Sequence, residues 1–146
     1  MEITIERLRL FLTPSLYSEL QKTANLELAN TALLSAISFF KSKVPCFNIK
    51  DWDAENLSEK QKEFIAASFT EIAKILSYNC LNFIPASNKE LKDVIITQYN
   101  MLIKLLEVSM GGKDGSICSI LKEEPEPPQF DVENFIGISN VRTIRR

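Results

Sequence analysis

The sequence predicts an all-α protein, an antiparallel bundle of about five helices (two short and three long) with an extended C-terminal arm. Three observations support this prediction. Apolar residues recur at spacings of three and four over long segments, which is the period of an α-helix. Helix-capping motifs precede two of these segments. Prolines separate the segments at places where a helix has to end.

The first part of the chain is predicted to form two short helices and one long helix. Thr4–Leu12 is the first short helix. Thr13 followed by Pro14 is typical of a cap with proline at the first helical position, and opens the second short helix. Asn25 is expected to cap the long helix Leu26–Lys43, which ends before the next proline.

The stretch from Ser58 to Lys113 is predicted to be a hairpin of two long helices. The first covers Glu59 to about Phe83, and the second covers Asn88 to about Met110. Each begins with a capping box, in which the hydroxyl of a Ser accepts from the third helical N–H and a Glu or Gln accepts from the N–H of that Ser. The two boxes are Ser58-Glu59-Lys60-Gln61 and Ser87-Asn88-Lys89-Glu90. Pro85 separates the two helices, and Gly111-Gly112 ends the second one.

We expect residues 1–112 to form the bundle domain and residues 113–146 to form the arm. Ser116–Leu121 is predicted to be a short strand or an extended segment. The acidic, proline-rich residues 122–128 favour an extended spacer that cannot bury itself. The apolar residues that follow are expected to dock onto the bundle itself or onto a neighbouring protein. Candidate contact residues in this region are Phe130, Phe135, Arg142, Arg145 and Arg146, whose arginines suit either phosphate or partner carboxylates.

The loop Cys46–Leu57 combines turn-forming residues with the large apolar side chains of Phe47 and Trp52. Trp52 is the single tryptophan of the chain. It either closes one end of the core or lies against another subunit, because tryptophan is enriched at interface hot spots. Phe47 and Trp52 are therefore candidate interaction residues.

Composition argues against several classes of protein. A net charge of −2 over 146 residues does not suit a protein built mainly to grip nucleic acid. No apolar run approaches the length of a membrane span, and the N-terminus does not have the pattern of a signal peptide, so we expect no membrane partner and an intracellular origin. The scattered cysteines Cys46, Cys80 and Cys118 are expected to be reduced, with Cys80 in the core.

The sequence contains no histidine, which removes the usual general base and the commonest zinc ligand. It also lacks a G-x-G-x-x-G motif and a P-loop. We therefore expect no catalytic residues, no metal and no cofactor, and a role in assembly or binding instead of catalysis.

Several segments resemble the Mu-type phage head–tail connector family. Ala36–Pro45 is similar to the third helix of that family, which ends with aromatic and basic residues before a proline. Ala73–Tyr78 resembles the middle of its fourth helix. The last helix of the family has an aromatic residue, apolar residues and a final Gly-Lys pair, and the matching positions here are Tyr99, Ile103, Leu105, Leu106, Gly112 and Lys113. The resemblance covers roughly residues 3 to 117, and the segment after Leu121 has no counterpart.

The resemblance implies a structural virion protein of a phage or prophage, made in the host cytoplasm and located in the neck of the particle. Such proteins assemble into a dodecameric ring beneath the portal protein, complete the head and receive the tail and neck proteins, while DNA passes through the lumen without sequence-specific binding. Two other hypotheses stay open from the residues themselves. One is a nucleic-acid-binding subunit of a defence complex, with a phosphate track of Lys60, Lys62, Lys74 and Lys104. The other is a helical regulatory adaptor.

Overall fold

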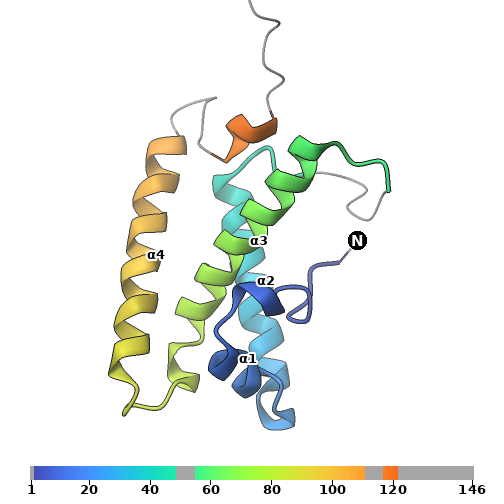
Figure 1. Ribbon diagram of the computed structural model, residues 1–146. Coiled ribbons are helices and arrows are strands. Elements are labelled where there is room, and N and C mark those ends of the chain that lie inside the picture. Colours follow the sequence, from blue (N-terminus) through green and yellow to red (C-terminus); the bar gives the residue numbers. More distant parts are fainter. Residues whose placement is uncertain (1, 49–54, 111–116, 122–146) are drawn as a thin grey trace, which may run out of the picture.

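The computed structural model describes residues 2–48, 55–110 and 117–121 (Figure 1). These residues form four α-helices and four short 3₁₀ helices, with no strand among them. The α-helices are α1 (Pro14–Leu20), α2 (Leu26–Lys43), α3 (Glu59–Asn79) and α4 (Lys89–Met110). The 3₁₀ helices are η1 (Arg9–Phe11), η2 (Thr23–Asn25), η3 (Leu81–Phe83) and η4 (Cys118–Leu121). The predicted all-α helical bundle is confirmed.

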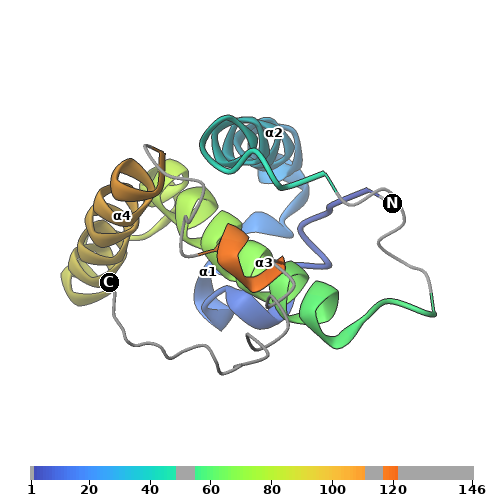
Figure 2. The ribbon, with the colours of Figure 1, turned by 90° about the horizontal axis from the view of Figure 1, so that it is seen from above.

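The helix α3 lies at the centre of the bundle (Figures 1 and 2). The helices α2 and α4 pack on different sides of it and also touch each other. The chain direction reverses between α2 and α3 and again between α3 and α4, as the colours of Figure 1 show. The short segment η4 packs on α3 at the end of the bundle where α3 begins.

The burial pattern of α3 explains its central position. The sequence predicts one apolar stripe, but the buried residues surround the helix and include small and polar side chains. They are Phe64, Ser68, Phe69, Glu71, Ile72, Ala73, Ile75, Leu76 and Ser77. A helix that is buried on most sides needs several partners at once. Every other long element of the bundle supplies one of them.

The outer helices bury one face each. In α2 the buried residues Ala29, Leu33, Ala36 and Phe40 follow the predicted spacing of three and four. In α4 the buried residues Ile95, Leu102 and Leu106 do the same. The N-terminal segment adds a series of buried leucines at positions 8, 12, 16 and 20. These apolar faces together form one hydrophobic core.

The first predicted helix, Thr4–Leu12, is wrong in type. The structure has turns followed by the single 3₁₀ helix η1. The backbone bonds join mainly residues three apart, since the N–H groups of Arg7, Arg9 and Phe11 donate to the carbonyls of Thr4, Glu6 and Leu8, which is the 3₁₀ pattern. Leu12 is extended (φ −106°, ψ 151°) ahead of α1. Spacings of three suit a 3₁₀ turn as well as an α-helix, which is why the apolar residues are still buried.

The turn between α3 and α4 also differs from the prediction. α3 ends at Asn79, and the chain continues as η3, so the expected extension to Phe83 is not α-helical. α4 begins one residue after Asn88, whose Oδ1 accepts from the N–H of Leu91 at 3.3 Å. Asn88 therefore takes the capping position that the sequence assigned to Ser87. The N–H of Asn88 donates to the carbonyl of Pro85 at 2.9 Å, and this turn fixes which of the two capping residues is used.

Residues 117–121 form a turn followed by η4, so the predicted strand or extended segment at Ser116–Leu121 is wrong over these residues. Ile117 is buried, and its carbonyl accepts from the N–H of Ile120 at 3.2 Å. Although the sequence placed these residues in the arm, they pack on the bundle. The remainder of the arm and the predicted stop at Gly111-Gly112 lie outside the described residues.

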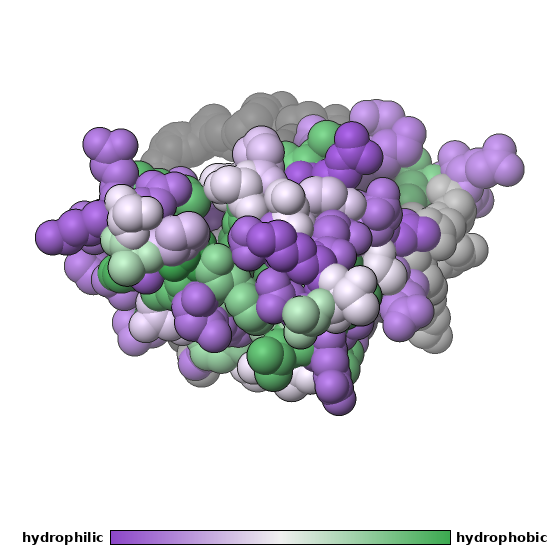
Figure 3. All heavy atoms as spheres, turned by 90° about the horizontal axis from the view of Figure 1, so that it is seen from below, coloured by the Kyte–Doolittle hydropathy of each residue, from purple (hydrophilic) through white to green (hydrophobic). Residues whose placement is uncertain are grey.

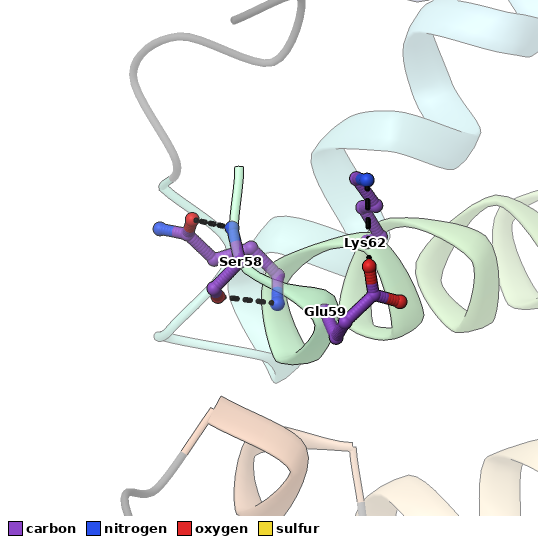
Figure 4. Close-up of polar contacts among 4 residues, drawn as sticks. Ser58, Glu59 and Lys62 are labelled. Carbon is purple, nitrogen blue, oxygen red and sulfur yellow. Dashed lines mark hydrogen bonds and ion pairs between the residues drawn. The ribbon is translucent and has the colours of Figure 1, made fainter. Parts of the chain in front are cut away.

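The capping box at the start of α3 is confirmed (Figure 4). The N–H of Gln61 donates to Ser58 Oγ at 3.1 Å, and the N–H of Ser58 donates to Gln61 Oε1 at 3.0 Å. These bonds satisfy donors that the first turn of a helix leaves unpaired. The central helix therefore has a well-defined start.

Replacing Ser58 with alanine is expected to lower the free energy of unfolding by about 1 kcal/mol, because one capping acceptor is lost. Urea denaturation followed by circular dichroism measures the change. Ser38→Ala is the control, since Ser38 is exposed within α2 and the change only favours helix. Equal stability of the two variants would contradict the role of the cap.

Truncating Leu76 to alanine is expected to cost about 2–5 kcal/mol, because Leu76 is fully buried in α3 and its removal leaves a cavity. The matched control is Leu34→Ala, whose side chain is 66% exposed on α2 and whose truncation is expected to change stability by less than about 0.5 kcal/mol. Thermal or urea unfolding of both variants tests the central position of α3. Similar losses in both would contradict it.

Candidate functional site

The structure places Phe47 in the core. Its ring packs edge-on against Phe40, with centroids 5.0 Å apart, and lies 6.1 Å from the ring of Phe64. Only 4% of Phe47 is exposed. The side chain therefore closes the end of the bundle, whereas the sequence placed it at a contact with another protein.

The other sequence-predicted interaction residues lie outside the described residues. They are Trp52, Phe130, Phe135, Arg142, Arg145 and Arg146. Their roles stay predictions, and a candidate site has to be built from the surfaces of α1–α4 and η4.

Two of the three cysteines form a disulfide. Cys46, just after α2, is bonded to Cys118, the first residue of η4, with Cα atoms 5.9 Å apart and a sequence separation of 72 residues. The expectation of three reduced thiols is therefore wrong for this pair. Spacing along the chain carries no information here, because the fold brings the end of α2 and η4 together on α3.

Cys80 is the free cysteine of the described residues, and it is fully buried after α3, as the sequence predicted. Burial raises the pKa of the Cys80 thiol to about 11. A buried, protonated thiol is a poor nucleophile, so Cys80 acts as a small core residue.

The sequence analysis missed a second apolar stripe on α4. Val94, Met101 and Leu105 are spaced by seven and four residues and are 49%, 66% and 39% exposed. The spacing places them on one flank of α4, beside the face that packs on α3. A second apolar series with helical spacing in the same helix is the sequence pattern that would have predicted this stripe. Exposed apolar side chains aligned in this way are typical of a protein contact.

A hollow lies between α2 and the end of α3, with a volume of about 350 Å³. It is lined by Leu28, Thr31, Ala32, Ser35, Asn79, Asn82 and Phe83. Figure 3 views the end of the molecule that carries α1 and η3, where hydrophilic residues surround separate hydrophobic patches. The lining combines hydroxyl, amide and apolar groups and contains no charged side chain. This chemistry does not point to one ligand class.

Tyr78 of α3 and Tyr99 of α4 stack face to face, with ring centroids 3.8 Å apart and an interplanar angle of 7°. Desolvation, and secondarily the neighbouring Tyr78, raises the pKa of Tyr99. The stacked rings join the two helices, and the hydroxyl of Tyr99 stays protonated at neutral pH. Their geometry suits packing better than acid–base chemistry.

Two of the four lysines in the nucleic-acid hypothesis are engaged with carboxylates. Lys62 Nζ lies 3.5 Å from Glu59 (Figure 4), and Lys74 Nζ lies 3.0 Å from Glu71. Both pairs join residues one helical turn apart. The exposed Lys62–Glu59 pair contributes little to stability, whereas Glu71 of the other pair is mostly buried. The carboxylates reduce the local positive potential that a phosphate track would need.

Among residues 2–48, 55–110 and 117–121, no group of three or more metal-ligating side chains comes together. None of the helices in the same part of the chain combines the length and the hydropathy that a membrane span requires. No protein-family profile matches this chain, and neither a curated protein nor a solved structure shows significant similarity to it. The resemblance to phage connectors therefore rests on the sequence segments described above.

In the folded protein, Cys80 is expected to react with iodoacetamide at least about a hundredfold more slowly than after unfolding in urea, because the raised pKa lowers the thiolate fraction near neutral pH. Mass spectrometry of the alkylated peptide measures the rate. The rate is expected to rise as the pH approaches 11. Fast labelling of the folded protein near pH 7 would contradict the buried position.

Proposed function

We propose that this chain is a structural subunit of a phage head–tail connector, which assembles into a ring under the portal and joins head to tail without catalysing a reaction. One structural observation supports this proposal in addition to the sequence. The segments that resemble the connector helices meet in the fold, since Tyr78 from the α3 segment stacks on Tyr99 from the α4 segment. The segments on which the resemblance rests are therefore neighbours in the bundle, as the proposal requires.

The surface of α4 supports an assembly role. A ring of identical subunits needs two different surfaces on each subunit, one for each neighbour. The stripe of Val94, Met101 and Leu105 offers an apolar centre for one of these contacts. The exposed polar residue Asn100 lies about a third of a turn around α4 from this stripe and would remain in water.

The charge of the chain is also compatible with a ring that DNA passes through. With a net charge of −2, the subunit has no large basic excess to hold the phosphate backbone. DNA would then move through the lumen without being bound tightly.

The proposal is tested by mixing the purified chain with the portal protein encoded in the same genome. Light scattering after gel filtration reports the mass of the complex, and negative-stain electron microscopy reports its shape. We expect ring-shaped particles seated on the portal. A chain that stays monomeric at every concentration and does not bind the portal would overturn the proposal.

Met101→Lys is expected to weaken subunit assembly at least about tenfold, because a buried, unpaired charge at the centre of an interface is costly. The control is Asn100→Lys, which adds the same charge at the preceding residue, about a third of a turn around α4 from the stripe. The concentration needed for half-maximal assembly on the portal measures both effects. Equal behaviour of the two variants would show that the α4 stripe is not a subunit contact.

A further inference from the structure

The Cys46–Cys118 disulfide joins two segments that are far apart in sequence and meet at one end of α3 (Figures 1 and 2). Cys46 follows the last turn of α2, and Cys118 begins η4. Both cysteines are partly exposed, so a small reductant in solution can reach the bond. The position is therefore accessible to thiol–disulfide exchange.

The segment that this bond holds is short, and its other attachment is its apolar packing on α3. η4 is a single 3₁₀ turn of four residues, which is too short to be stable alone. Ile117 is buried, and Ile120 and Leu121 pack at the margin of the core. The disulfide adds a covalent attachment to this small apolar contact.

The surface beneath η4 is apolar. η4 packs on α3, and Val44 and Phe47 at the end of α2 are buried beside the disulfide. Phe47 is in contact with the fully buried Phe64 of α3. Departure of η4 would expose part of this apolar end of the bundle to water or to a partner.

We propose that the Cys46–Cys118 bond is a redox-controlled clip, which holds η4 on the end of the bundle when oxidised and allows it to leave when reduced. A dithiol reductant opens the clip in two steps. Its thiolate attacks one sulfur to give a mixed disulfide, and its second thiol then displaces that sulfur. The products are the thiols of Cys46 and Cys118 and one oxidised dithiol, so two electrons and two protons pass to the protein.

The third cysteine does not interfere with this exchange. Cys80 is fully buried and has a raised pKa, so it supplies very little thiolate to attack the pair. The clip is also peripheral to the packing of α2, α3 and α4, whose buried faces form most of the core. Opening the clip therefore leaves the bundle folded.

Hydrogen–deuterium exchange of the full chain, with and without dithiothreitol, tests the clip. Reduction is expected to raise the exchange of residues 117–121 on the order of tenfold or more, while peptides from the centres of α2, α3 and α4 stay protected. A variant with both C46S and C118S is the control. It is expected to exchange quickly at residues 117–121 whether or not reductant is present.

Three results would overturn the proposal. Alkylation and mass spectrometry of the air-oxidised, unfolded chain could find three free thiols, which would mean that the pair does not form. Residues 117–121 could remain equally protected after reduction, so that the bond would not control their docking. Reduction could unfold the whole bundle, and the disulfide would then be a structural staple and not a clip.

Discussion

The burial of α3 is the constraint on which the rest of the structure depends. Its buried residues occupy most of its circumference and include Phe64 and Ile72 as well as the polar Ser68. One neighbouring helix covers a single face, so α3 can be buried only if α2, α4 and the N-terminal segment surround it. The helices α3 and α4 run antiparallel, as expected for helices that a short connection joins. η4 completes the cover where α3 begins.

Periodicity and caps were sufficient to predict the long helices. The bounds of α2 agree with the prediction, and α4 starts within one residue of it, because both sequences keep the helical spacing up to a capping or breaking residue. Ser87 and Asn88 are both good caps, and the turn at Pro85 decides between them. The α-helix predicted over Thr4–Leu12 is wrong because apolar spacings of three fit 3₁₀ turns equally well, and the backbone bonds here mainly join residues three apart.

The candidate surfaces were harder to predict, because they depend on which residues the fold leaves uncovered. Met101 and Leu102 are adjacent apolar residues in one helix, yet one is 66% exposed and the other 2% exposed. Leu102 shares its helical spacing with the buried Ile95 and Leu106, whereas Met101 lies outside that series. Phe47 shows the converse, since a large side chain in a polar loop is typical of a contact residue but here fills the core. The pairing of Cys46 with Cys118 depends on tertiary proximity alone.

The disulfide is consistent with the proposed virion role, because a phage particle moves from the cytoplasm of its host to the outside of the cell. Thiols stay reduced in the cytoplasm where such a protein is made, and they oxidise readily outside the cell. A subunit that assembles inside the host and leaves with the particle would meet both conditions in that order. The clip would then be open while partners are added and closed in the released particle. In a protein that stays in the cytoplasm, the same pair would remain reduced, so the redox state of Cys46 and Cys118 in isolated particles bears on both proposals.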